Sequence, residues 1–87
     1  MTIYFDKNCA YWSNDNKMNE HFLNRQTDYI RDLVKHRGYI YLNQIYEILG
    51  IKWEPRYENH CIENAYFTVV VGWDCKQSRW VVDILTN

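Results

Sequence analysis

Residues 65–85, AYFTVVVGWDCKQSRWVVDIL, decide the fold because they predict two strands joined by a short turn. Residues 65–73 are rich in β-branched and aromatic side chains, which favour strands. In residues 79–85 apolar side chains recur at every second position, as expected of a strand with one buried face. These apolar residues are Trp80, Val82 and Ile84. The five residues 74–78 are enough for a turn, so the stretch predicts an antiparallel β-hairpin.

A lone hairpin is marginal in water, so its apolar face must pack against other elements. Upstream, residues 17–37 and 41–49 carry apolar side chains at helical spacing. Gly38 and Gly50 follow these stretches, where helices commonly end in a left-handed residue. Residues 3–5 are a candidate third strand. The sequence therefore predicts an α+β fold: two helices, joined as an αα-hairpin or corner, packed against a small antiparallel sheet built on the C-terminal β-hairpin.

We expect one stripe of the long helix to face the core. The stripe consists of Met18, Phe22, Tyr29 and Leu33, widened by Leu23, Ile30 and Val34. Phe22, Tyr46, Phe67 and Trp80 are the aromatic residues that we assign to the core. Residues 51–64 are predicted to be a polar connection, because the residue before Pro55 avoids the helical region.

The length of 87 residues predicts one small domain, residues 1–87, with a thin core. Four Trp, eight Tyr and three Phe compensate, since each buried aromatic removes a large area from water. The formal net charge is −1 and the sequence shows no basic stripe. Because nucleic-acid binders usually carry a clear positive excess on one face, direct nucleic-acid binding is not expected.

The compartment is predicted from three features. The N-terminus lacks the pattern of a signal peptide, and no apolar run approaches the roughly 20 residues that span a bilayer. The cysteine count is odd, which fits a reducing environment. We therefore expect a protein of the bacterial cytoplasm with no membrane partner.

One pattern carries a family resemblance. Residues 37–50, RGYIYLNQIYEILG, place R-G-Y at a helix end and follow it with an L-N-x-x-Y-x-x-L-G helix, and residues 71–73 add V-G-W in a strand. Over residues 20–85 the chain resembles a group of small phage and mobile-element proteins of Firmicutes. That group's pattern ends in a strand with an aspartate and a glycine. Here Asp83 is present and the glycine is missing.

The resemblance implies a phage or prophage origin and no known catalytic activity. Small accessory phage proteins often bind and disable host proteins, and anti-CRISPR inhibitors of Cas9-type nucleases are one such class. The implied function is therefore that of a phage-encoded inhibitor that blocks a host Cas9-type effector by direct contact.

Aromatic and acidic residues predict where a partner binds. Tyr39, Tyr41, Tyr57, Trp12, Trp53 and Trp73 are more large side chains than one small core holds, and Tyr and Trp commonly anchor interfaces. The acidic side chains of residues 51–64 can steer a basic partner. The predicted contact residues are Trp53, Glu54, Tyr57, Glu58 and Glu63. Two alternatives stay open: ordinary core-edge packing and solvated surface, or use of the aromatics in a homodimer.

A structural zinc site is a second hypothesis, although no cofactor is required by the sequence. The candidate ligands are Cys9, His36, His60, Cys61 and Cys75. Zinc takes four ligands, commonly in close-spaced pairs, and no C-x₂-C or H-x₃-H pair is present. Cys61 near His36, or Cys9 near Cys75, are the pairings easiest to imagine. The alternative is three ordinary cysteines without metal.

Two further functions are considered and ranked lower. A nucleophilic Cys–His pair needs a positive neighbour and a shaped pocket, and neither is visible, so the chain is not expected to be an enzyme. Residues 42–49 follow a tight turn as in a helix-turn-helix, but they carry no Lys or Arg for phosphate contacts. The alternatives to an inhibitor are a zinc-stabilised phage accessory protein with another partner and a DNA-binding regulator.

Overall fold

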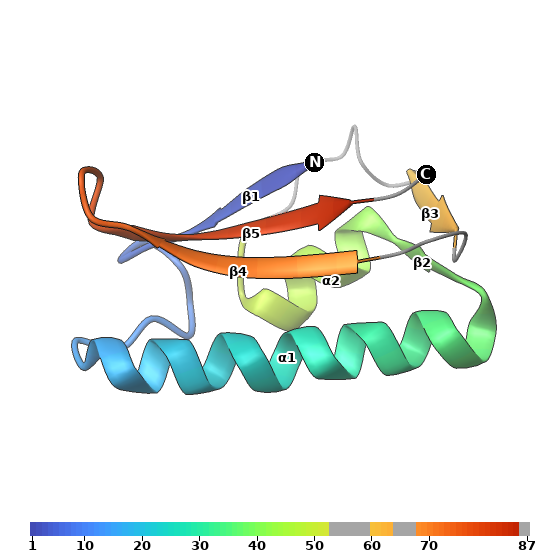
Figure 1. Ribbon diagram of the computed structural model, residues 1–87, viewed down its shortest axis with the longest axis horizontal. Helices are drawn as coiled ribbons and strands as arrows, with labels where there is room; N and C mark the ends of the chain where they lie inside the picture. Colours follow the sequence, from blue (N-terminus) through green and yellow to red (C-terminus); the bar gives the residue numbers. More distant parts are fainter. Residues whose placement is uncertain (53–59, 64–67, 86–87) are drawn as a thin grey trace.

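The computed structural model describes residues 1–52, 60–63 and 68–85. The helices are α1 (Asn16–Arg37) and α2 (Leu42–Leu49). The strands are β1 (Thr2–Phe5), β2 (Tyr39–Tyr41), β3 (Cys61–Glu63), β4 (Thr68–Asp74) and β5 (Arg79–Leu85). In Figure 1, α1 runs along the long axis of the molecule below the strands, and α2 is seen behind β4 and above α1. The predicted α+β class is confirmed.

The main sheet has the strand order β1-β5-β4, and both pairings are antiparallel. The β4–β5 pair is the predicted hairpin, with Val71 opposite Val82 and Trp73 opposite Trp80. The first part of its predicted first strand, residues 65–67, lies outside the described residues. β1 supplies the third strand along the other side of β5, with Ile3 opposite Val82. β5 is therefore the central strand, and its buried face carries Trp80, Val82 and Ile84 as expected.

A second, two-stranded sheet of β2 and β3 corrects the sequence prediction. Residues 61–63 were expected to belong to a polar connection, but they pair antiparallel with β2, so that Ile40 lies opposite Ile62. Both isoleucines are buried, and the amide of Leu42 extends the ladder to the carbonyl of His60 at 2.8 Å. The helices are therefore joined through a short strand. The pairing was missed because one buried side chain per strand gives no readable period.

The core face of α1 also differs from the expected one. The buried residues are Asn19, Leu23, Thr27, Ile30 and Val34. Met18 and Tyr29 are 61% and 49% exposed, so the prediction that they face the core is wrong. Phe22 and Leu33 are half-buried at the edge of the core. The stripe that faces the core is centred on Leu23, Ile30 and Val34, which the sequence analysis places at the edge of the predicted stripe.

Two polar side chains hid this face in the sequence. Asn19 is buried because it closes a pair with Ser13: the Ser13 amide donates to Asn19 Oδ1, and Asn19 Nδ2 donates to the Ser13 carbonyl, both at 2.8 Å. The Thr27 hydroxyl donates to the carbonyl of Asn24 at 3.1 Å. Buried polar groups are tolerated when hydrogen-bonded, so these residues pack as core members.

The prediction that four aromatic residues belong to the core is confirmed in part. Trp80 is buried, and its Nε1–H donates to Asn16 Oδ1 at 2.8 Å, so the indole anchors the first turn of α1 to the sheet. Phe22 and Tyr46 are half-buried against the core. Phe67 lies outside the described residues. Among the helices of the described ranges, none is long and apolar enough to cross a membrane.

Both helices end at the predicted glycines in the left-handed conformation, Gly38 at φ 83° and Gly50 at φ 71°. Gly50 has a second constraint, because a Cβ atom there would overlap the ring of Tyr11, whereas one on Gly38 would meet open space. The Ala10 amide donates to the Gly50 carbonyl at 2.9 Å. The N-terminal loop is thus held directly against the end of α2.

Alanine substitutions at the glycines should therefore separate the cost of the left-handed backbone from the cost of the overlap with Tyr11. Gly38→Ala should cost about 1–2 kcal/mol of unfolding free energy from the left-handed backbone alone. Gly50→Ala should cost about 1–3 kcal/mol more because Tyr11 must also move. Gly72→Ala, at negative φ and facing open space, is the control and should stay within about 0.5 kcal/mol. Urea unfolding checks the order, and equal losses at Gly38 and Gly50 would contradict the Tyr11 constraint.

Candidate binding surface

The outer face of the β2–β3 pair carries Tyr39, Tyr41, Cys61 and Glu63, and we call these four residues the tyrosine ribbon. Side chains alternate along a strand, so burial of Ile40 and Ile62 turns their neighbours outward. All four ribbon residues are exposed. Tyr39 lies opposite Glu63, and Tyr41 lies opposite Cys61.

The two tyrosine rings of the ribbon contact one another. Their centroids lie 5.6 Å apart at an interplanar angle of 73°, which is the edge-to-face arrangement that aromatic pairs prefer. The guanidinium carbon of Arg37 lies 4.9 Å from the centroid of Tyr39, within cation–π range. Each ring is 39% exposed. The pair therefore presents a fixed aromatic surface to solvent.

Gln44 of α2 fixes the backbone beneath these rings. Its Oε1 accepts from the Tyr41 amide at 3.1 Å and from Arg37 Nη2 at 3.0 Å. Arg37 Nη2 also lies 3.4 Å from the Tyr39 carbonyl, so one guanidinium and one amide connect α1, β2 and α2. A surface that is ordered before binding loses less conformational entropy on contact. The tyrosine ribbon is thus preorganised.

The predicted contact residues are only partly placed. Glu63 is exposed and lies across from Tyr39 in the ribbon. The other four predicted residues, Trp53, Glu54, Tyr57 and Glu58, lie outside the described residues. Sequence reasoning missed Arg37 and Gln44, since only the fold shows that they support the two tyrosines.

The other aromatic residues predicted to lie at the surface fall into an exposed group and a half-buried group. Trp73 is exposed, as are Tyr39 and Tyr41. Trp12 is half-buried, with its ring centroid 5.5 Å from that of Phe5. The expectation of exposed aromatics and the alternative of core-edge packing therefore each hold for some of these residues.

The metal-ligand candidates are dispersed over the chain. Cys9 lies in the N-terminal loop, Cys61 in the tyrosine ribbon and Cys75 in the β4–β5 turn. His36 and His60 are exposed, and His36 Nδ1 lies 2.8 Å from the carbonyl of Asp32. Over residues 1–52, 60–63 and 68–85, no three His, Cys, Asp or Glu side chains gather closely enough to hold a metal ion. Zinc binding stays a prediction.

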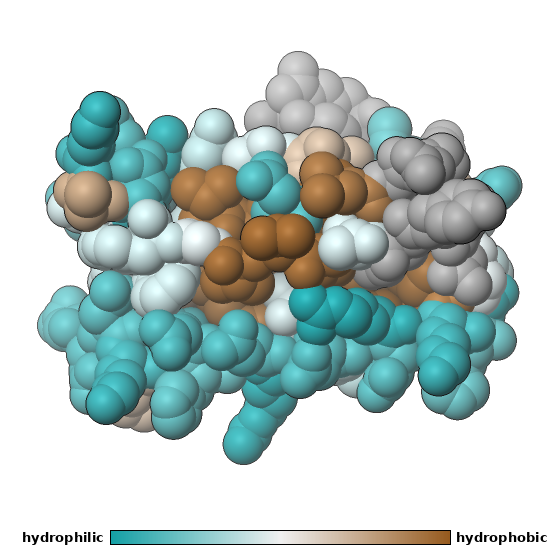
Figure 2. Space-filling view, in the orientation of Figure 1, coloured by the Kyte–Doolittle hydropathy of each residue, from teal (hydrophilic) through white to brown (hydrophobic). Residues whose placement is uncertain are grey.

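The open face of the main sheet is a second exposed surface. Its apolar members include Tyr4, Val70 and Leu85, and Figure 2 shows apolar surface gathered over β4 and β5 above a hydrophilic α1. The Arg79 guanidinium carbon lies 3.7 Å from the Tyr4 ring centroid, and Arg79 Nε lies 3.7 Å from Asp74 Oδ2. Arg79 and Asp74 are therefore in contact with one another on this face.

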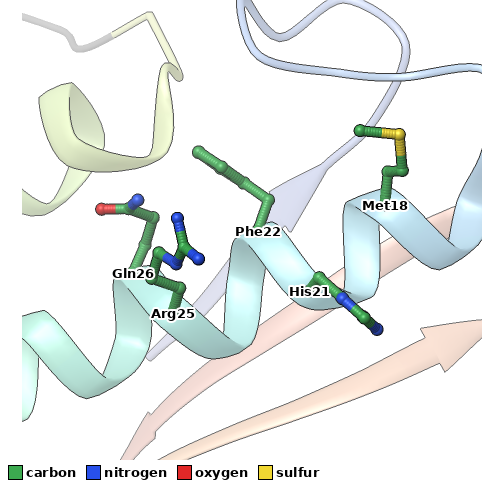
Figure 3. A pocket seen from close by; sticks show the side chains of 5 residues that line it. All are labelled: Met18, His21, Phe22, Arg25 and Gln26. Atoms are coloured by element: carbon green, nitrogen blue, oxygen red, sulfur yellow. The ribbon is translucent and has the colours of Figure 1, made fainter.

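A hollow of about 300 Å³ lies beside α1. Figure 3 shows the side chains that line it, projecting from successive turns of the helix: Met18, His21, Phe22, Arg25 and Gln26. Among the described lining residues there is no cysteine, so the hollow does not bring a thiol and an imidazole together.

Comparisons with protein-family models, with curated proteins and with solved structures found no match. The resemblance of residues 37–50 to the phage group therefore stays a prediction. Of the residues that carry this pattern, Tyr39 belongs to the tyrosine ribbon and Arg37 contacts its ring, whereas Tyr41 and Gln44 stand at positions that the pattern leaves open.

The three thiols should differ in reactivity. Burial raises the pKa of Cys9, and the nearby Asp6 carboxylate adds to the rise while a backbone hydrogen bond from Asp6 opposes it. A raised pKa leaves less thiolate at pH 8. With an aromatic disulfide reagent at that pH, Cys61 and Cys75 should react in a fast phase and Cys9 in a slow one. Raising the pH should accelerate the slow phase, and Cys9→Ser should remove it; three equal rates would contradict this placement.

Proposed function

We propose that this chain is a binding protein without catalytic activity, namely a phage-encoded inhibitor that blocks a Cas9-type nuclease by direct protein–protein contact through the tyrosine ribbon. The observation that carries the proposal is the ordered, solvent-facing pair of Tyr39 and Tyr41. Tyrosine is enriched at interface hot spots because it offers large contact area with few rotatable bonds.

The fold itself does not account for these rings. Ile40, between them, is fully buried and anchors β2 in the core, while both tyrosines point away from it. Arg37 lies against the Tyr39 ring, and the polar contacts of Arg37 and Gln44 hold the backbone of the strand that carries both rings. The Gln44 contact also caps α2, so it is the exposure of the two contacting rings that favours a role outside the chain's own stability.

The choice of partner is supported by chemistry and by the family resemblance. Glu63 adds a carboxylate beside Tyr39, and residues 51–63 carry further acids in sequence. A carboxylate next to aromatic anchors fits a partner with a basic surface, and complementary charge raises the association rate. Cas9-type effectors are basic along their nucleic-acid channels. The resemblance of residues 37–50 points to the same class of partner.

The proposal is tested by adding the chain to a cleavage reaction of a Firmicute Cas9 with its guide RNA and target DNA. The wild-type chain should suppress cleavage and co-elute with the nuclease. Loss of one hot spot costs about 2 kcal/mol, which is about a 30-fold loss of affinity. The double variant Tyr39→Ala/Tyr41→Ala should therefore require at least this excess to inhibit.

The matched control is Tyr4→Ala, which removes an exposed tyrosine from the open face of the main sheet and should inhibit as the wild type does. Circular dichroism verifies that each variant is folded. Full cleavage at every concentration of the wild-type chain would reject the partner. Undiminished inhibition by the double variant would reject the tyrosine ribbon, and a low-salt gel shift with the chain alone would favour the DNA-binding regulator instead.

A further inference from the structure

α1 carries a second apolar stripe that the described part of the fold leaves partly open. Its members are Met18, Phe22, Tyr29 and Leu33, which follow helical spacing on a face next to the core stripe. Met18 and Tyr29 are the two most exposed of the four, and both are large. Large apolar side chains exposed along one line of a helix commonly mark a contact with another molecule.

The N-terminal half of this stripe contains the hollow of Figure 3, between Met18, Phe22 and Arg25. Its floor is rigid, because the Phe22 ring stacks on the buried Phe5 ring at 5.5 Å and contacts the Tyr11 ring at 5.4 Å. A rigid hollow of this size fits one aromatic side chain. In the C-terminal half of the same stripe, the ring of Tyr29 projects into solvent.

Charges alongside the stripe change sign between the two halves. By helical spacing, His21 and Arg25 flank its N-terminal half, and Asp28 and Asp32 flank its C-terminal half on the same side. Of the arginines that the structure describes, Arg31, Arg37 and Arg79 each contact a carboxylate, a carbonyl or a ring.

Arg25 differs from these arginines. Within the described chain it has no such partner, and the same holds for the imidazole of His21 and the carboxylate of Asp32. Charge complementarity is therefore present between the two halves of one helix face. Asp28 already pairs with Arg31 at 2.6 Å within the molecule, whereas Arg25, His21 and Asp32 have no such contact in the described chain.

We infer that α1 forms the interface of a homodimer, in which the helices of two copies pack antiparallel along this second stripe. With Phe22 of one copy opposite Tyr29 of the other, Met18 lies opposite Leu33, and each Tyr29 ring enters the hollow of the second copy. On the flank, His21 then meets Asp32 and Arg25 meets Asp28. A two-fold axis repeats every contact, as required of an isologous interface.

A second copy fits this face better than an unrelated partner because the face is complementary to itself. The Tyr29 ring and the hollow that receives it lie on the same helix. The basic side chains His21 and Arg25 and the acidic side chains Asp28 and Asp32 also lie on that helix. In a parallel two-fold pair the charged flanks of the two copies would lie on opposite sides, whereas an antiparallel pair places the basic end of one flank beside the acidic end of the other, so the pattern selects the antiparallel orientation. The paired stretch from Met18 to Leu33 is about 22 Å long, which makes the interface small and the dimer transient.

Sedimentation equilibrium of the full chain tests the inference over about 1 µM to 1 mM, the range expected of a small interface. The average mass should rise from the 10.7 kDa of one chain to about twice that value. His21→Glu should keep the chain monomeric because it places a carboxylate opposite Asp32, and Asp32→Arg should weaken the dimer because it removes the acid opposite His21. The double variant should restore the dimer, since Glu at 21 then meets Arg at 32 of the second copy.

Two further variants separate the interface from general effects. Tyr29→Ala should abolish the dimer while circular dichroism remains that of the folded chain, and Tyr39→Ala/Tyr41→Ala, in the tyrosine ribbon, should leave the dimer unchanged. A wild-type chain that stays monomeric at 1 mM overturns the inference. So does a dimer that survives Tyr29→Ala, or a folded charge-swap double variant that stays monomeric.

Discussion

The pairing of β1 with β5 is the contact on which the rest of the structure depends. It joins the first strand to the last described one, and the Met1 ammonium donates to the Ile84 carbonyl at 2.9 Å while the Ile84 amide donates back to Met1 at 2.8 Å. β5 becomes central only through this pairing, and its apolar face is then enclosed between two neighbours. β4 completes the sheet on the other side of β5, and α1 covers its buried face. A contact of such long sequence separation raises the contact order of the fold, which slows folding.

Sequence patterns predicted the elements that are long enough to show a period. The hairpin of β4 and β5 and both helices were predicted for this reason, and the C-terminal glycines marked both helix ends. The face of α1 was not predicted, because Asn19 and Thr27 lie in its core stripe and only their hydrogen bonds make them suitable there. The β2–β3 pair was missed because Ile40 and Ile62 stabilise it from far apart in sequence. Local periodicity carries no information about such pairings.

The candidate surface was also predictable from the sequence only in part. Composition alone indicated that a thin core cannot hold every aromatic, and Tyr39 and Tyr41 are indeed exposed. Composition could not indicate that the strand carrying these tyrosines is held by Arg37 and Gln44. These contacts depend on the end of α1 lying close to the start of α2. A single exposed tyrosine is ordinary, whereas two exposed rings in contact on a hydrogen-bonded strand support the proposal of a contact surface. The distinction lies in tertiary geometry and therefore requires the fold.

α1 connects the tyrosine ribbon to the proposed dimer interface. Its last residue, Arg37, supports the ring of Tyr39, and the turn at Gly38 leads directly into β2, so the position of the ribbon is fixed relative to the helix axis. In an antiparallel helix pair centred near Arg25, the two C-terminal ends point in opposite directions and lie about 35 Å apart. The two ribbons would then face away from each other at the ends of the dimer. Such a dimer would present one ribbon at each end, so its avidity for a single partner would depend on whether that partner offers two sites at this separation.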